Sequence, residues 1–295
     1  MKKLTLATLF VLFLLARPLQ AGLELLHQFA PSNNQGCNPL GDLVGDGSYF
    51  YGMTGKLGQF NGGTIFRIKS DGSGFLVLHA FAGGAADGAD PGGSLIVSGT
   101  TLYGLSMNGG DNDEGTVFKI QTDGSGFALL HEFAGGAADG AYPRGSLIIS
   151  GTTLYGMTAE GGGSDVGTVF KIGVAGTGFA LLHAFNLNDG AYPAGSLVIS
   201  GTTLYGLTYG RIEDFESDQE DPWGTIFRIG INGSGFSRLH EFNYDDGGWP
   251  LASLVVSGTT LYGMAHAGGP SGEGVIFKIG TDGRDFSVQD QHFAY

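Results

Sequence analysis

The sequence has almost no cysteine, few basic residues and no motif that identifies a reaction. Cys37 is the only cysteine among 295 residues, so no disulfide can form within the chain and stability must come from packing. Lys and Arg number 14 against 28 Asp and Glu. An acidic chain of this kind is a poor partner for nucleic acid or for an anionic membrane surface, and we expect it to bind neither.

A long hydrophobic run is also missing beyond the first residues. The apolar stretch at 4–16 follows two lysines and is too short to span a bilayer, which takes about 20 residues. This order predicts a secretory signal peptide over residues 1–21. Its removal leaves 11 basic against 28 acidic residues, a net charge of −17. We therefore expect an exported chain, secreted or periplasmic, without membrane insertion after cleavage, and a single repeat domain over 22–295.

Glycine is the residue type in excess, with 56 of 295 positions, whereas soluble proteins average about 7%. A disordered chain would contain few aromatic and β-branched residues. Here Phe, Tyr, Val, Ile and Leu fill the segments between the glycines. This composition favours many short strands joined by glycine turns.

The heptapeptide SGTTLYG occurs four times, letter for letter. Its tyrosines and that of a fifth, altered copy recur at intervals of 52, 52, 50 and 57 residues, at Tyr51, Tyr103, Tyr155, Tyr205 and Tyr262. A period near fifty residues is typical of propeller blades or of a solenoid. The sequence therefore contains five repeats.

Each repeat carries four strand signals whose polarity rises along the chain. The first, after Pro143, is apolar on both faces, the third carries Lys171 on one face, and the fourth carries Glu132 on one face. A sandwich would instead alternate apolar and polar residues on every strand. We predict an all-β, five-bladed β-propeller of four-stranded antiparallel blades, with a β-solenoid as the alternative.

An additional copy of the fourth strand stands at the N-terminus. Residues 23–29 read LELLHQF, whereas the last copy, at 286–293, has its histidine displaced. We predict that 23–29 closes the ring by pairing beside the strand at 275–279.

The succession G-T-[VI]-F-[KR]-I, D-G-S-G-F, L-H-x-F, P-x-G-S-L and L-Y-G-x-T resembles the GloVer tandem-repeat family of exported bacterial proteins. The resemblance covers nearly the whole mature chain. It implies no particular activity, because that family has no established one. Many of its members are similar to surface proteins with a C-terminal sorting segment, which this sequence does not show.

A histidine recurs in the fourth strand of successive repeats. Ligands of one zinc ion must each approach it within about 2.1 Å, whereas adjacent sheets lie about 10 Å apart. We therefore expect the imidazoles to bind neighbouring loops, and we expect no metal site, no cofactor and no catalytic residue. The histidines are His27, His79, His131, His183 and His240.

The linkers between repeats carry Asp-Gly pairs followed by a variable position. Asp side chains cap turns, and glycine supplies positive φ, so a structural role is expected. The alternative is a polar pocket at each blade junction, where aromatic residues beside a carboxylate suit a sugar. The candidate binding residues are Asp87, Asp139, Asp189 and Asp246 of the pairs, and Tyr142, Tyr192 and Trp249 at the variable position, which holds Asn38 and Asp90 in the other repeats.

Two further features are weaker. Cys37 occupies a slot that holds alanine in three other repeats, which indicates a small buried residue rather than a nucleophile. The acidic insertion at 211–221 could bind calcium, but it lacks the spacing of an EF-hand loop and fits a solvated loop better.

Three functions are compatible with this sequence. Similar blades create similar sites, which favours a non-enzymatic binding module for glycan or a cell-surface protein. A polysaccharide-active enzyme would need two carboxylates in unlike environments, and the repeats single out no such pair. A passive structural repeat protein is the third possibility.

Overall fold

The computed structural model describes residues 24–30, 34–210 and 223–288, and the regular structure in them consists of β-strands. Five sheets form five blades, over residues 37–80, 88–132, 140–184, 193–241 and 255–288. Blade 1 contains β1 (Cys37–Gly45), β2 (Phe50–Lys56), β3 (Thr64–Ile68) and β4 (Leu76–Ala80). Blade 2 contains β5 (Gly88–Ser98), β6 (Thr101–Gly109), β7 (Thr116–Gln121) and β8 (Ala128–Glu132).

Blades 3 to 5 repeat this order. Blade 3 has an inner strand split into β9 (Gly140–Pro143) and β10 (Ile148–Ser150), followed by β11 (Thr153–Gly161), β12 (Thr168–Gly173) and β13 (Ala180–Ala184). Blade 4 contains β14 (Pro193–Ser200), β15 (Thr203–Thr208), β16 (Thr225–Gly230) and β17 (Ser237–Glu241). Blade 5 contains β18 (Val255–Ser257), β19 (Thr260–Ala265), β20 (Val275–Gly280) and β21 (Ser287–Val288).

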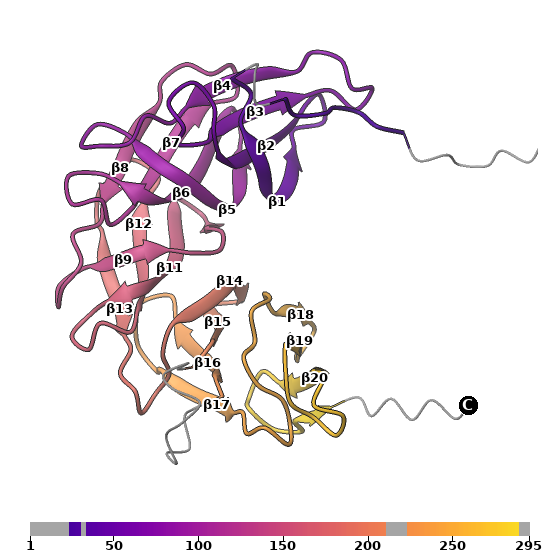
Figure 1. Cartoon of the computed structure of the whole chain (residues 1–295). Coiled ribbons are helices and arrows are strands. Elements are labelled where there is room, and N and C mark those ends of the chain that lie inside the picture. Colours follow the sequence, from indigo (N-terminus) through magenta and orange to yellow (C-terminus); the bar gives the residue numbers. More distant parts are fainter. Residues whose placement is uncertain (1–23, 31–33, 211–222, 289–295) are drawn as a thin grey trace, which may run out of the picture.

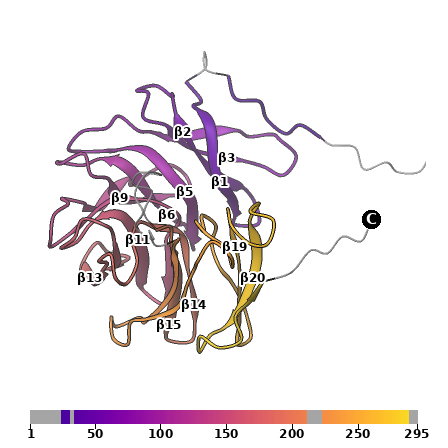
Figure 2. The same cartoon turned by 60° about the horizontal axis from the view of Figure 1, so that its bottom comes forward.

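Within a blade each strand pairs antiparallel with the next, as the four strand signals predicted, and both halves of the split strand of blade 3, β9 and β10, pair with β11. The blades follow one another along an arc, with β1, β5, β14 and β18 towards its centre and β4, β8, β13 and β17 at the rim (Figure 1). Figure 2 shows the same succession from a second direction. The all-β, five-bladed propeller architecture is thereby confirmed.

The core lies between blades rather than within one. Between blades 1 and 2, for example, Tyr51 and Met53 pack against Leu95, Leu102 and Phe118, and all five are buried. Both faces of an inner blade are therefore covered, which is why its strands are apolar on both sides.

A row of glycines and serines links the inner strands around the axis. A Cβ on Gly93 would lie 1.9 Å from the carbonyl oxygen of Gly145, so the two backbones touch and only glycine fits. Beside this contact, the Ser94 N–H donates to Ser146 Oγ at 2.8 Å, and the Ser146 N–H donates to Ser196 Oγ at 2.8 Å. The recurrent Gly-Ser pair thus fixes how closely one blade approaches the next.

The predicted ring closure is not made in this structure. Residues 24–30 form no strand and lie on blade 1, where His27 stacks on Phe75 with ring centroids 3.8 Å apart. The outer edge of β20 is paired instead with β21, through Phe277 and Val288. Pairing of the N-terminal strand with β20 stays a prediction.

Several predicted segments lie outside the described residues, namely the signal peptide at 1–21, the insertion at 211–221 and the displaced His292. Within the residues that the structure describes, no helix is long and apolar enough to cross a membrane.

Candidate functional site

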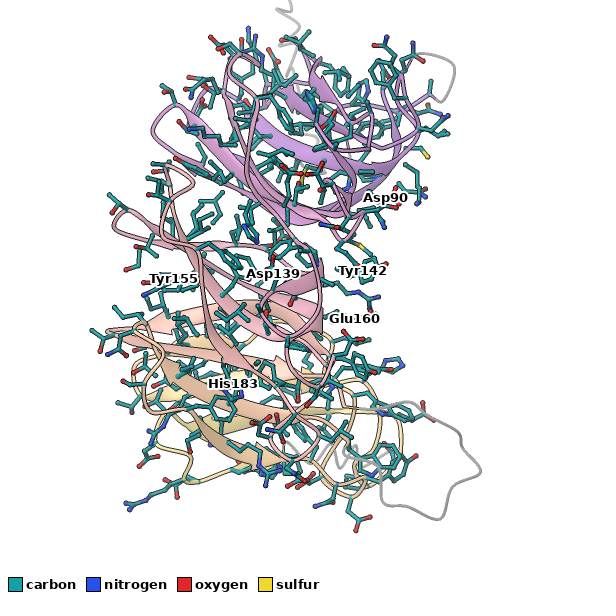
Figure 3. The ribbon with its side chains drawn as sticks, turned by 90° about the vertical axis from the view of Figure 1, so that its left-hand side faces the viewer. Asp90, Asp139, Tyr142, Tyr155, Glu160 and His183 are labelled. Atoms are coloured by element: carbon teal, nitrogen blue, oxygen red, sulfur yellow. The ribbon has the colours of Figure 1, made fainter. Side chains whose placement is uncertain are left out.

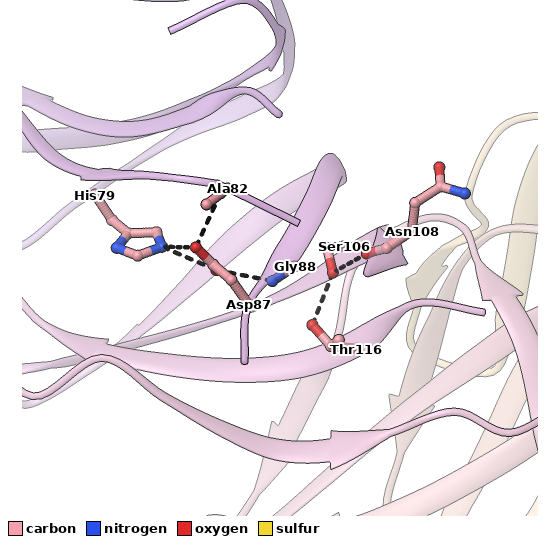
Figure 4. A network of polar contacts seen from close by, with 7 residues as sticks. All are labelled: His79, Ala82, Asp87, Gly88, Ser106, Asn108 and Thr116. Atoms are coloured by element: carbon pink, nitrogen blue, oxygen red, sulfur yellow. Dashed lines mark hydrogen bonds and ion pairs between the residues drawn. The ribbon is translucent and has the colours of Figure 1, made fainter. Parts of the chain in front are cut away.

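The repeated histidines and the linker aspartates form one paired unit in each of four blades. His79 Nε2 lies 3.0 Å from Asp87 Oδ1 (Figure 4). The same carboxylate accepts the N–H groups of Ala82 at 2.9 Å and Gly88 at 2.7 Å, and thereby holds the linker turn. The corresponding pairs are His131–Asp139 at 3.0 Å, His183–Asp189 at 3.1 Å and His240–Asp246 at 3.0 Å.

Each imidazole also stacks on a phenylalanine of the next blade. The ring centroids of His79 and Phe127 are 3.8 Å apart, and those of His183 and Phe236 are 3.7 Å apart. The bonds to the linker aspartates agree with the prediction that the imidazoles bind neighbouring loops. The stacking between neighbouring blades was not predicted. In the part of the chain that the structure describes, no three His, Cys, Asp or Glu side chains are placed to hold a metal ion.

Burial favours the neutral form of two of these histidines. It lowers the pKa of His183 and of His240, and it outweighs the opposite effects of Asp189 and Asp246. The aspartate oxygens are engaged by these imidazoles and by backbone N–H groups. Any ligand contact of Asp87, Asp139, Asp189 or Asp246 would compete with this structural role.

The variable linker position has the same unusual backbone in every blade. Its φ angle is positive in all five copies, at 53° for Asn38, 51° for Asp90 and Tyr142, and 52° for Tyr192 and Trp249. Asn and Asp tolerate this left-handed conformation, whereas a bulky aromatic residue seldom adopts it. The strained backbone at Tyr142, Tyr192 and Trp249 was not predicted from the sequence.

Hydrogen bonds from the preceding blade hold this conformation. The Tyr142 N–H donates to the Glu114 carbonyl at 2.8 Å, and the Trp249 N–H donates to the Trp223 carbonyl at 2.8 Å. The variable residues of blades 2 to 5 thus lie at junctions between two blades, whereas Asn38 stands on blade 1, which no blade precedes in the described residues. We call the side of the molecule that carries these five residues the junction face.

The aromatic side chains of the junction face are half-buried. In Figure 3, Asp90, Tyr142 and Glu160 lie along one side of the molecule, and Tyr155 lies on the opposite side. Tyr192 also packs partly against the core between blades 3 and 4. The sequence analysis offered a polar pocket at each blade junction as the alternative, and the three aromatics lie half-buried at three of these junctions.

The junctions differ in chemistry. At the first, Lys56 Nζ lies 2.8 Å from Asp90 Oδ2. At the second, the Glu114 carboxylate, followed by burial and Glu160, raises the pKa of Tyr142. Burial, together with the charge of Asp165, raises the pKa of Glu160. This second junction offers a phenol among carboxylates, which suits hydrogen bonding to hydroxyl groups.

The junction between blades 4 and 5 is an aromatic cluster, defined by Tyr209, Trp223, Tyr244 and Trp249. Ring centroids are 4.9 Å apart for Trp223 and Trp249, 4.9 Å for Trp223 and Tyr244, and 6.3 Å for Tyr209 and Trp249. Tyr244 is 46% exposed. The sequence analysis did not identify Tyr209, Trp223 and Tyr244, although each stands at a position where the other repeats carry no aromatic residue.

Comparisons with solved structures find β-propellers. A chain from a structure described as a nidogen/laminin complex aligns with a TM-score of 0.52 at 14% identity, covering 86% of this chain and 79% of its own. TolB from Acinetobacter baumannii aligns at 0.48 and 14% identity, covering 86% of this chain and 54% of its own. A putative TolB from Agrobacterium tumefaciens aligns with a TM-score of 0.46 at 12% identity, covering 85% of this chain and 78% of its own.

The sequence itself is similar to a family of repeats. No curated protein matches it. A family model described as the Gloeobacter/Verrucomicrobia repeat matches residues 11–217, which is most of the chain. The matched stretch includes the recurrent LYG and Gly-Ser segments that build the blades. The chain belongs to the Gloeobacter/Verrucomicrobia repeat family.

Proposed function

We propose that this chain is an exported, non-enzymatic binding module whose junction face binds carbohydrate. One observation carries the proposal: Tyr142, Tyr192 and Trp249 hold bulky side chains in a left-handed backbone conformation. Strain of this kind costs on the order of 1–3 kcal/mol and concentrates at functional sites. Packing does not require aromatics there, because Asn38 and Asp90 adopt the same conformation in the first two blades.

The chemistry of the junctions favours a sugar as ligand. Apolar sugar faces stack on aromatic rings, and sugar hydroxyls need hydrogen-bond acceptors and donors beside them. The aromatic cluster supplies the rings, with Trp223 and Trp249 4.9 Å apart. The second junction supplies carboxylates and a phenol in Glu114, Glu160 and Tyr142.

Repetition supports binding to a polymer. Linked weak sites raise overall affinity when one ligand reaches several of them at once. The four junctions between blades lie on one scaffold, so a glycan with repeating units can contact more than one. A cell-surface protein is the other ligand that such a face could bind, and a protein-binding assay would distinguish it.

The test replaces the three aromatics with a residue that the chain itself uses at this position. The triple variant Tyr142→Asn, Tyr192→Asn, Trp249→Asn keeps a side chain compatible with positive φ, as in Asn38. We expect glycan-array signals of the wild-type chain to fall by about tenfold or more, since each lost stacking contact weakens binding.

The matched control is Tyr262→Ser, which removes an aromatic residue that is 42% exposed on the end of blade 5. It should leave glycan binding unchanged. Binding of the triple variant at wild-type strength, with its fold verified by circular dichroism, would overturn the proposal.

A further inference from the structure

Blade 5 exposes a face that is buried in every other blade. Tyr262 is 42%, Met264 53% and Ile276 53% exposed. The corresponding residues of blade 4, Tyr205, Leu207 and Ile226, are 5%, 1% and 0% exposed because blade 5 covers them. We call this uncovered surface, with Val255, the trailing face. Its residues correspond to those that are buried between neighbouring blades elsewhere, but no neighbouring blade covers them in the described residues.

Blade 1 exposes the opposite half of the same interface. Leu43 is 52% and Phe50 36% exposed, whereas their counterparts in blade 2, Leu95 and Leu102, are 2% and 0% exposed. This leading face is hollowed by a groove of about 270 Å³ that is lined by Leu26, Leu40, Leu43 and Phe66, among other residues. In the other blades, the preceding blade fills this position.

Residues 24–30 lie on the leading face in the position of an outer strand, although they pair with no other strand there. His27 stacks on Phe75 at 3.8 Å, as His79 of β4 stacks on Phe127 at 3.8 Å in the next blade. A Cβ on Gly72 would lie 2.8 Å from the carbonyl oxygen of Leu26, as one on Gly124 would lie 3.3 Å from that of Leu78. The segment thus takes the place of the outer strand of a blade that precedes blade 1.

Blade 5 cannot be that preceding blade while it keeps its own outer strand. β21 pairs with β20 at Phe277–Val288, which is the register of Phe118–Leu129 in blade 2. If the trailing face docked on the leading face, β21 and residues 24–30 would compete for one place. A second copy of the chain meets the same conflict, because its blade 1 also carries its own residues 24–30.

The unit that fits without displacing a strand has three strands. We propose that the opening between blades 5 and 1 (Figure 1) receives a further segment of this repeat type, comprising inner, second and third strands, and that residues 24–30 become its outer strand. One face of the segment packs on Tyr262, Met264 and Ile276, and the other packs on Leu43 and Phe50. The backbone of 24–30 then gains a ladder by strand addition.

The row of Gly-Ser contacts that links the inner strands around the axis has complementary hydrogen-bonding groups at its two ends. Ser196 N–H donates to Ser253 Oγ at 2.9 Å, and Asp42 N–H donates to Ser94 Oγ at 2.7 Å. Asp42 stands where the other blades have serine, and its carboxylate can accept the N–H of a preceding Gly-Ser segment. A Pro-x-Gly-Ser-Leu segment in the opening would therefore continue the row on both sides.

The experiment adds such a segment in trans. The probe is a polypeptide of residues 140–173, which contains β9 to β12 but not β13, fused to a soluble carrier. Titration calorimetry should give one probe per chain, and peroxide oxidation of Met264, followed by mass spectrometry, should slow about tenfold or more on burial. The matched control probe carries Leu154→Asp and Val169→Asp, one substitution on each of its faces, and should not bind.

Variants of the chain test each face separately. Ile276→Asp alters the trailing face and Leu43→Asp the leading face, and each should abolish binding while the chain stays folded. Four results would overturn the proposal. They are absence of binding by the wild-type probe, binding that survives both variants, protection of Met264 in the free monomer through closure on itself, and a concentration-dependent oligomer that protects Met264.

Discussion

Ile226 and Ile276 occupy the same place in successive blades, yet the first is fully buried and the second is 53% exposed. Their strands, β16 and β20, have the same length and the same register against the second strand of the blade. Blade 5 packs on Ile226, whereas no blade of the described residues packs on Ile276. The repeat encodes an interface between neighbouring blades. An interior blade therefore packs against two neighbours, whereas each end blade packs against one.

The largest effect should come from placing a carboxylate at these two positions. Ile226→Asp buries an unpaired charge between blades 4 and 5 and should cost about 4 kcal/mol or more. Ile276→Asp, on the trailing face, should cost about 1 kcal/mol or less, because the carboxylate stays hydrated. Urea unfolding measures both, and equal losses would show that the trailing face is covered in solution.

A glycine pair tests the contact between inner strands. Gly145 and Gly151 both have positive φ, at 80° and 61°, but a Cβ on Gly145 would lie 1.8 Å from the Gly195 carbonyl oxygen, whereas Gly151 faces open space. Both alanine variants bear a left-handed penalty of about 1 kcal/mol, and Gly145→Ala should lose about 2 kcal/mol more through overpacking. Thermal unfolding of the two variants gives the comparison.

The histidine–aspartate pairs allow a comparison with the first repeat, where His27 Nε2 lies 3.2 Å from Gln35 Oε1 instead of a carboxylate. Asp189→Asn imitates that neutral pair but weakens the bonds from His183 and from the Asn186 side-chain amide. We expect a loss of about 1–2 kcal/mol. Denaturant midpoints of the variant that match wild type would show that the charge is dispensable in blade 3 as well.

The smallest effect is the pH dependence from His183 and His240. Burial lowers both pKa values in the folded state, so the unfolded chain binds more protons once the pH falls below its ordinary histidine value of about 6.5. Stability from these groups is complete above that pH and declines as the pH falls towards the folded-state pKa. The melting temperature should therefore fall between pH 7 and 5.5, and less so in the double variant His183→Gln, His240→Gln.

The repeat made the fold predictable from sequence. Tyr155, Lys171 and their counterparts marked strands whose polarity rises outwards, and that gradient is the one that the blades show. Ring closure could not be settled in this way. The pattern of residues 23–29 indicates an outer strand, but its pairing partner depends on the curvature of four successive junctions, which no single repeat contains.

The candidate site was predictable in position but not in composition. The variation among Tyr142, Tyr192 and Trp249 indicated a position that packing leaves free. Its positive φ could not be anticipated, because Tyr and Trp seldom adopt that conformation. The aromatic cluster was missed because Tyr209, Trp223 and Tyr244 come from three separate segments that only the fold brings together.

Methionine oxidation of the wild-type chain tests the central claim, that interior faces are covered and the trailing face is open. Met53 and Met157 are 1% and 2% exposed at the same blade position where Met264 is 53% exposed. With hydrogen peroxide and peptide mapping, we predict that Met264 oxidises at the rate of an exposed methionine, and that Met53 and Met157 are protected about a hundredfold or more. Equal protection of all three would contradict the account.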